Sequence, residues 1–209
     1  MSRPKFDQSA CETLAGCVRG IEKTTDAELV IVVRARSGQY THADYLCGAL
    51  LAFLGLLFLL FSPFDFHHNW VAIDVALLFA LGIYLSSKSN FVRRLFTTKK
   101  FREKAVRTSA AAMFYEAGIA NTSAEMGVLI YLSLFERQLE LIADRGILKA
   151  VPTLEWNQRL FELHQAGKKP EVPTFLNALC KLGELLTEHL PATGENPDEL
   201  PDVPRFDLK

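Results

Sequence analysis

Three acidic residues, Glu28, Glu125 and Asp144, flank short apolar runs that we expect to form the strands of a sheet. If the first two strands run parallel and the third runs back, these carboxylates lie at one end of the sheet, with Arg145 beside them. Three carboxylates suit a hard cation such as calcium or magnesium, because these ions prefer oxygen ligands. Equally, an acid could position water on a phosphoester while Arg145 binds the phosphate.

A purely structural role is the alternative for the same residues. Asp144 and Arg145 would then form the tight turn by which the chain leaves the third strand toward Gly146. Glu28 and Glu125 would be solvated. The sequence has no G-x-S-x-G, H-E-x-x-H, phosphate-loop or G-x-G-x-x-G motif, so hydrolase and nucleotide chemistry have no independent support. We therefore assign no catalytic residue. The four cysteines lack C-x-x-C spacing, which argues against a zinc site or a redox pair.

The strands that would hold these groups are short and rich in β-branched residues. Glu28–Arg36 is apolar on both faces at its centre, as in a buried parallel strand. Gly127–Leu134 and Gln138–Asp144 lie on either side of Phe135-Glu136-Arg137 and predict an antiparallel hairpin. The first two strands, joined through a helix, should run parallel.

Amphipathic periods predict four helices around these strands. Ser9 and Glu12 have the spacing of a capping box at the start of the first, with Asp7 as an alternative cap. Together the elements predict an α/β fold with a small mixed sheet covered by helices. Residues 191–209, rich in proline and acids, should form an extended tail. The expected helices are Phe6–Lys23, Thr98–Gly118, Leu154–Ala166 and Pro173–Leu190.

Two long apolar stretches interrupt this pattern after the first strand. Tyr45–Phe61 has no charged residue, and Trp70–Leu85 has one, Asp74. Each approaches the length of about 17–25 residues that a helix needs to cross a bilayer. Because the bridge Ser62–Asn69 is too short to fold alone, we expect a transmembrane hairpin. The domain organisation is then 1–44 and 88–190 for the α/β domain, 45–87 for the hairpin and 191–209 for the tail.

Basic residues gather just after the second apolar stretch, whereas the bridge has no lysine or arginine. Basic flanks stay in the cytoplasm, so we expect a two-pass protein of a bacterial inner membrane with both termini cytoplasmic. The cluster could bind anionic headgroups or serve only as a topology signal. The net charge of −1 and the membrane tether argue against nucleic acid. The headgroup candidates are Arg93, Arg94, Lys99, Lys100 and Arg102.

Polar and small residues inside the apolar stretches have two interpretations. Asp74, as an intramembrane carboxylate, could pair with a partner helix or reach water near the non-cytoplasmic surface. Gly48, Gly55 and Gly82 could let neighbouring helices approach closely or could simply fill the seam of the hairpin.

The same stretches resemble the TPM domain family. The resemblance is carried by Asp26–Val33, Phe114–Gly118, Gly127–Ile130, Glu136-Arg137 and Ala143–Ile147, in this order, over roughly residues 6–44 and 98–190. That family includes a plant thylakoid-lumen acid phosphatase and many bacterial membrane-associated proteins. The resemblance implies a mixed sheet between helices, and residues 139–147 are similar to a branch that carries a membrane hairpin.

The chain departs from the metal-binding members of that family at two places. Glu125 and Met126 stand where those members tend to have an acid and an asparagine. The residues after the third strand lack the distal glutamate of the family's Gly-Tyr-Gly-Leu-Glu stretch, whereas Glu28 matches an acidic position. We therefore expect no required cofactor and at most weak calcium or magnesium binding.

The sequence therefore favours a membrane-anchored TPM-like binding or assembly module. Its expected partners are anionic lipids and either an unidentified membrane protein or a second copy of the chain. The alternative is a membrane-tethered acid phosphatase that depends on a divalent metal.

Overall fold

The computed structural model describes residues 6–63, 68–194, 199–201 and 203–208, with the backbone alone at 68 and 69. The chain forms two compact units, of which the first comprises Met1–Ser37 and Glu103–Lys209. The second unit, Gly38–Arg102, contains the two apolar stretches. It begins before and ends after the expected insert of residues 45–87, and it also includes the short helix Asn90–Leu95.

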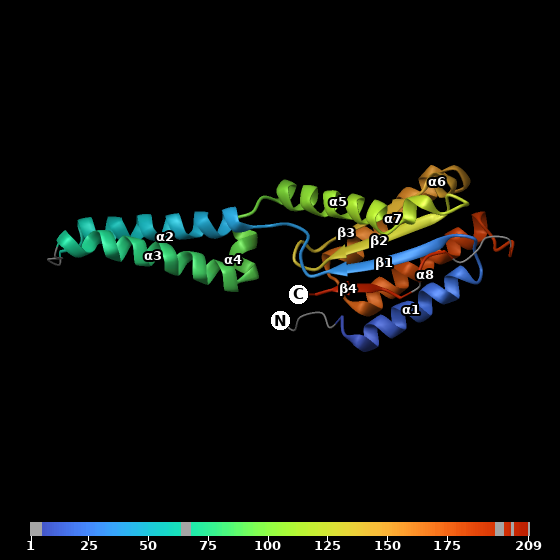
Figure 1. Cartoon of the computed structure of the whole chain (residues 1–209), viewed down its shortest axis with the longest axis horizontal. Coiled ribbons are helices and arrows are strands. Elements are labelled where there is room, and N and C mark those ends of the chain that lie inside the picture. The colour runs from blue at the N-terminus through green and yellow to red at the C-terminus, as the bar shows by residue number, and fades with distance from the viewer. Residues whose placement is uncertain (1–5, 64–67, 195–198, 202, 209) are drawn as a thin grey trace. The chain divides into compact units, whose positions relative to one another are not determined.

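A four-stranded mixed sheet in the order β3-β2-β1-β4 lies at the centre of the first unit (Figure 1). β1 (Glu28–Arg34) pairs in parallel with β2 (Gly127–Ser133), with Glu28 opposite Gly127. β2 pairs antiparallel with β3 (Gln138–Ala143). Both predicted pairings are confirmed, and the strands end one or two residues earlier than the sequence suggested.

The fourth strand, β4 (Arg205–Asp207), was not expected. It pairs in parallel with the outer edge of β1, and Ala35 donates a backbone hydrogen bond to the carbonyl of Asp207 at 2.8 Å. The expected extended tail therefore contributes an unexpected edge strand to the sheet at this segment. The free edge of β1 offers unpaired backbone groups, and three residues after Pro204 suffice to pair with them.

Helices cover both faces of the sheet. On one face, Leu29, Ile31 and Val33 of β1 pack with the first helix, the last two helices and Ile147. On the other face, Val30 and Val32 pack with α5. This double burial explains why β1 is apolar on both faces. The covering helices are α1 (Gln8–Glu22), α5 (Lys99–Glu116), α6 (Arg145–Ala150), α7 (Thr153–Lys168) and α8 (Val172–His189).

Helix ends differ from expectation at two positions. Asp7 caps α1, because its Oδ1 accepts a hydrogen bond from the backbone of Ala10 at 3.1 Å, so the expected capping box of Ser9 is wrong. Gly167 lies inside α7 instead of following it, and its missing side chain lets α7 approach β3 closely, because a Cβ there would lie 2.8 Å from Leu139. Gly118, with a φ of 75°, lies just beyond the end of α5 and leads into a short 3₁₀ helix, Ile119–Asn121.

The second unit is a helical hairpin with a short third helix. Its elements are α2 (Thr41–Phe61), α3 (His68–Lys88) and α4 (Asn90–Leu95). Gly48 and Gly82 face each other across the α2–α3 seam, where a Cβ on Gly82 would lie 2.7 Å from the Cα of Gly48. Gly48 and Gly82 therefore let α2 and α3 approach closely, the first of the two interpretations that the sequence left open. Residues 64–67 of the expected bridge lie outside the described part.

Candidate functional site

The sheet places Glu28, Glu125 and Asp144 at one end, as strand direction requires. Glu28 opens β1 opposite Gly127, and the backbone of Asp144 donates to the carbonyl of Gly127 at 2.9 Å. Yet their ligand atoms do not form a group within 4.8 Å of one another. Glu28 is buried and Glu125 is exposed, so these two carboxylates are in different environments.

Hydrogen bonds at this end support a structural role for two of the three acids. Oδ1 of Asp144 accepts from the backbone of Arg145 at 2.7 Å and caps α6. Oε2 of Glu28 accepts from the backbone of Glu199 at 3.2 Å and so holds the returning C-terminal segment. Gly146 is required here, because a Cβ would lie 2.6 Å from the carbonyl oxygen of Glu125. The exposed Arg145 follows directly, at the first position of α6.

Weak cation binding at this end remains a prediction. Oδ2 of Asp144 is buried without a hydrogen-bond partner among the described residues, so an ion has at least one available ligand. We expect calcium or magnesium to bind with a Kd on the order of 10⁻⁴–10⁻³ M, as at low-affinity oxygen sites. Millimolar ion should then raise the Tm by a few degrees at most, because only the folded state binds it.

Asp144→Asn should reduce this shift, whereas Glu171→Gln on the exposed surface should leave it unchanged. The measurement is a thermal melt over a calcium titration, with calorimetry to give the Kd. A sub-micromolar isotherm or a complete absence of a shift would each contradict the prediction.

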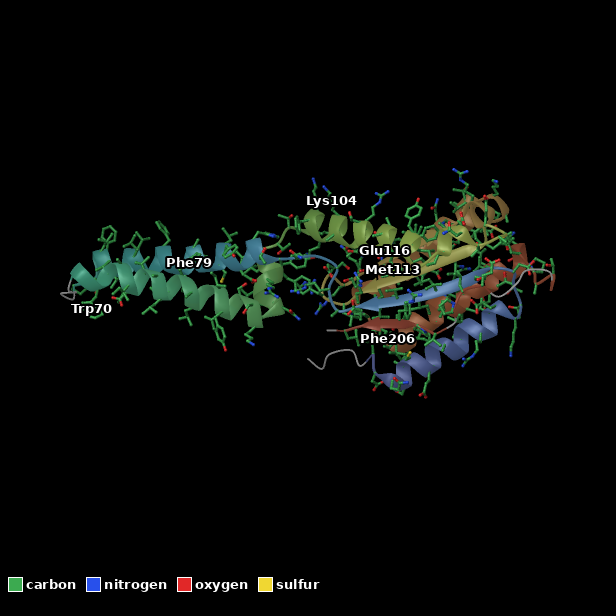
Figure 2. All side chains as sticks on the ribbon, in the orientation of Figure 1. Trp70, Phe79, Lys104, Met113, Glu116 and Phe206 are labelled. Carbon is green, nitrogen blue, oxygen red and sulfur yellow. The ribbon has the colours of Figure 1, made fainter. Side chains whose placement is uncertain are left out.

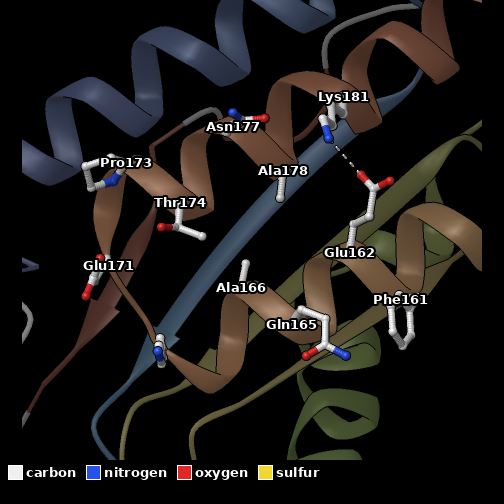
Figure 3. Close-up of a pocket in the computed structure, with 11 residues that line it drawn as sticks. Phe161, Glu162, Gln165, Ala166, Glu171, Pro173, Thr174, Asn177, Ala178 and Lys181 are labelled. Carbon is white, nitrogen blue, oxygen red and sulfur yellow. Dashed lines mark ion pairs between the residues drawn. The ribbon is translucent and has the colours of Figure 1, made fainter.

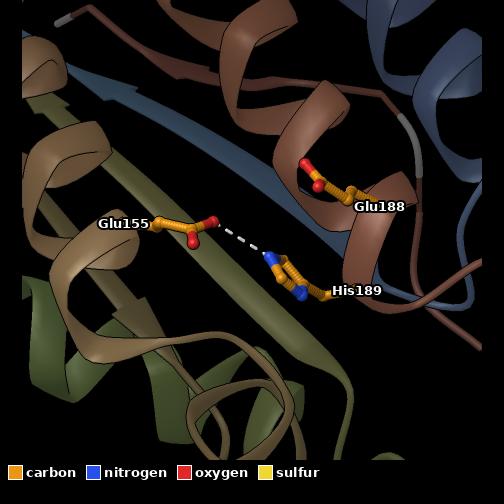
Figure 4. Close-up of side chains that lie close together, drawn as sticks. All are labelled: Glu155, Glu188 and His189. Atoms are coloured by element: carbon orange, nitrogen blue, oxygen red, sulfur yellow. Dashed lines mark hydrogen bonds and ion pairs between the residues drawn. The ribbon is translucent and has the colours of Figure 1, made fainter.

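Among the described residues, a different set brings three potential ligands together. Glu155 at the start of α7 and Glu188 and His189 at the end of α8 have ligand atoms within 4.8 Å of one another (Figure 4). Nε2 of His189 lies 3.0 Å from Oε2 of Glu155, so the two already form a hydrogen bond. Both glutamates are exposed, and the hydrogen bond between the antiparallel helices α7 and α8 accounts for the position of Glu155 and His189. This group could not be found from the sequence, since Glu155 lies 34 residues before His189.

A shallow pocket of about 640 Å³ lies between α7 and α8 (Figure 3). Phe161 and Ala178 contribute apolar surface, and Lys181 forms an ion pair with Glu162 at 3.4 Å. The pocket contains no buried charged group or nucleophile that would suggest a reaction. It was not anticipated from the sequence.

At the opposite end of the sheet, a buried polar network surrounds Ser37. Glu136 is 2% exposed and accepts from the backbone of Ser37 at 3.0 Å and from the hydroxyl of Ser133. The hydroxyl of Ser37 in turn contacts Tyr131 and Ser133, each at 2.9 Å. Ser109 donates to the Ser37 carbonyl at 2.9 Å. Ser37 is thus fixed at the point where the chain leaves the first unit.

The open end of the hairpin contains a second buried network, centred on Asp44. Nε of Arg93 donates to Oδ1 of Asp44 at 2.9 Å and Nη2 donates to Oδ2 at 2.7 Å, a bidentate ion pair. Ser86 donates to Oδ1 at 2.7 Å. The three residues belong to α4, α2 and α3, so a single carboxylate joins all three helices of this unit.

This network shields Arg93 from solvent. Its side chain is 15% exposed, and the hydrogen bond from its guanidinium to Asp44 raises the pKa of Arg93. Arg93 is therefore engaged within the protein, and we leave it out of the proposed lipid surface. The sequence contains a signal for this pair that we missed: Asp44 directly precedes the first apolar stretch and Arg93 follows the second, so opposite charges flank the hairpin.

The remaining basic candidates have different environments. Lys99 and Lys100 are exposed at the start of α5, and Arg94 is half-buried. Arg102 donates to the carbonyl oxygens of Arg94 at 3.0 Å and Thr97 at 2.8 Å, so it stabilises the α4–α5 turn. Aromatic side chains accompany them, and the ring of Phe101 lies 4.7 Å from that of His42.

The outer surface of the hairpin is strongly apolar (Figure 2). α2 and the segment Trp70–Lys88 are each long and apolar enough to cross a membrane. Only 17% and 11%, respectively, of their most apolar windows is buried, unlike in the core helix of a soluble protein. Asp74 is half-buried on α3, and its side chain forms no hydrogen bond or ion pair within the described residues. Exposed apolar side chains include Phe53, Phe58, Phe61, Trp70 and Leu77.

Comparisons with known proteins bear on the fold alone. No family model matches the chain, and the search of curated proteins returns no match. Among solved structures, the chain is similar to the NMR structure of the BA42 protein from the psychrophilic bacterium Bizionia argentinensis. The TM-score is 0.59 at 15% sequence identity, and the match covers 97% of this chain and 95% of that chain. At this identity the likeness shows a shared fold.

Proposed function

We propose that the chain is a two-pass membrane protein whose α2–α3 hairpin anchors a TPM-like α/β unit on the cytoplasmic face of a bacterial inner membrane. In this role the α/β unit binds or assembles with another membrane component. The observation that carries the proposal is the exposed apolar surface along both helices of the hairpin. A helix of 21 residues is about 31 Å long, close to the thickness of the hydrocarbon core.

Packing within the hairpin supports insertion as a unit. The glycine seam brings α2 and α3 together, and the Asp44 network joins their ends at the side where the chain enters and leaves. The remaining apolar side chains lie on the outer surface of the hairpin, where contact with lipid would remove them from water. Membrane fractions washed with alkaline carbonate should retain the full-length chain, and its release into the supernatant would overturn the proposal.

Anionic lipid should stabilise the folded protein by binding Lys99 and Lys100. Each basic residue near an anionic surface contributes about 1 kcal/mol. We expect a higher Tm in nanodiscs with phosphatidylglycerol than in purely zwitterionic ones. The double variant Lys99→Gln/Lys100→Gln should lose most of this difference. The matched control Lys168→Gln/Lys169→Gln, at the end of α7, should keep it, and equal loss in both variants would refute a specific juxtamembrane site.

A membrane-tethered, metal-dependent phosphatase is the alternative, and an assay separates it from a binding module. The expected result is no phosphatase activity above background in the detergent-solubilised chain, with or without calcium or magnesium. Metal-dependent turnover that Asp144→Asn abolishes would favour the enzyme instead. If no activity is found, affinity capture from native membranes would identify the partner of the binding module.

A further inference from the structure

The first and last long helices of the α/β unit, α1 and α8, pack along a parallel seam of three residue pairs. Just beyond the end of α1, the hydroxyl oxygen of Thr24 lies 2.8 Å from that of Thr187 on α8. One turn earlier, Gly183 packs so closely on Ile21 that a Cβ would lie 2.6 Å from the Ile21 side chain. One turn earlier again, the sulfur atoms of Cys17 and Cys180 are 3.6 Å apart. The backbones on the C-terminal side of the cysteines are thus held close by other contacts.

The two thiols differ in their access to solvent. Cys180 is exposed on α8, whereas Cys17 is partly buried on α1. Burial, together with the hydrogen bond and charge interaction with Cys180, raises the pKa of Cys17 to about 12. Cys17 therefore stays a thiol near neutral pH, and a reagent from solution reaches Cys180 first.

We propose that Cys17 and Cys180 form a reversible disulfide-modification site that accepts a small soluble disulfide, such as oxidised glutathione, as its oxidant. The Cys180 thiolate attacks one glutathione sulfur, forms a mixed disulfide and releases one glutathione thiolate. The Cys17 sulfur then attacks the Cys180 sulfur and breaks the mixed disulfide, and the proton of Cys17 passes to the second glutathione as it departs. Two protein thiols and one oxidised glutathione give one protein disulfide and two reduced glutathione molecules.

The geometry makes the second step local. The sulfur atoms must close from 3.6 Å to a bond of about 2.05 Å, which side-chain rotation and a small helix adjustment can supply. The new bond would link residues 163 positions apart, a closed loop that includes the whole hairpin and the strands β1, β2 and β3. Closing so long a loop restricts the unfolded chain, so the oxidised protein should be the more stable form. In a reducing cytoplasm, a disulfide of this kind is transient and reports redox state.

The test uses the full-length chain in nanodiscs, incubated with oxidised glutathione. We expect the intact mass to fall by two hydrogen atoms, a cross-linked peptide that joins Cys17 to Cys180, and a Tm several degrees higher that dithiothreitol reverses. Cys17→Ser should instead retain glutathione on Cys180, and Cys180→Ser should give no cross-link. Cys11→Ser, on the same helix as Cys17, should behave as the unmodified sequence does.

Three outcomes would overturn the inference. The first is stable glutathionylation of Cys180 in the unmodified sequence without a cross-link. The second is a cross-link that involves Cys11 or Cys47. The third is a Cys17–Cys180 disulfide that leaves the Tm unchanged or lowers it, since the folded state would then be strained by the bond.

Discussion

Arg93→Ala should destabilise the base of the hairpin by about 3 kcal/mol, because it leaves the buried carboxylate of Asp44 without its cation. Asp44 is 8% exposed and Arg93 15% exposed, so water compensates little for the lost partner. α4 has few other contacts that hold it: none of its residues is buried. We therefore expect α4 to undock from α2 and α3 in this variant.

Hydrogen–deuterium exchange of the full-length chain in nanodiscs measures this effect directly. Backbone amides of residues 90–96 should exchange on the order of 100-fold faster in Arg93→Ala, as expected for about 3 kcal/mol. Asp44→Ala should have a similar effect, and the double variant should recover part of it, since no unpaired charge remains. Asp74→Asn, the other acid of the hairpin, is the matched control and should leave the exchange unchanged. Additive losses in the double variant would contradict a direct Asp44–Arg93 interaction.

Gly82→Ala should force the two apolar helices apart. The three atoms nearest to the added Cβ would all belong to the backbone. They are the Cα of Gly48 at 2.7 Å, the carbonyl oxygen of Cys47 at 3.0 Å and the nitrogen of Gly48 at 3.1 Å. Backbone atoms cannot rotate out of the way, so the helices must separate, at a cost of about 1–3 kcal/mol.

Gly55→Ala is the matched control in the same seam. Its Cβ would meet only the side chain of Leu78, whose rotation relieves the contact. Both variants gain the same helix propensity, about 1 kcal/mol, so their difference reports the seam itself. We expect unfolding of the hairpin in mixed micelles, followed by circular dichroism, to require less sodium dodecyl sulfate for Gly82→Ala than for Gly55→Ala. Equal midpoints would show that α2 and α3 do not cross at Gly48 and Gly82.

The sheet could be predicted from the sequence because its strands have strong local patterns. The continuous apolar run of β1 indicates burial on both faces, and the short polar break at Phe135-Glu136-Arg137 fixes the β2–β3 hairpin. β4 could not be predicted, because three residues between prolines and acids have no periodicity of their own. Its pairing depends on the free edge of β1, which exists only in the folded unit.

The candidate sites were harder to predict, since side-chain partners come from distant parts of the chain. Strand direction correctly placed Glu28 and Asp144 at one sheet end, but it did not reveal that Asp144 caps α6. Cysteine spacing argued against a redox pair, yet packing of α1 on α8 brings Cys17 and Cys180 together. Asp44 and Arg93 flank the hairpin in the sequence, but only the fold of α4 against the hairpin shows that they pair.

The membrane topology of the chain tests the central claim most directly. A tag inserted within Ser62–Asn69 should be cleaved by protease added to spheroplasts, because the bridge lacks lysine and arginine and should lie outside. A fluorescent reporter fused after Lys209 should remain intact in the same cells, because the basic residues after α3 should hold the α/β unit in the cytoplasm. Protection of the bridge tag, or loss of the C-terminal reporter, would contradict a two-pass protein with both termini inside.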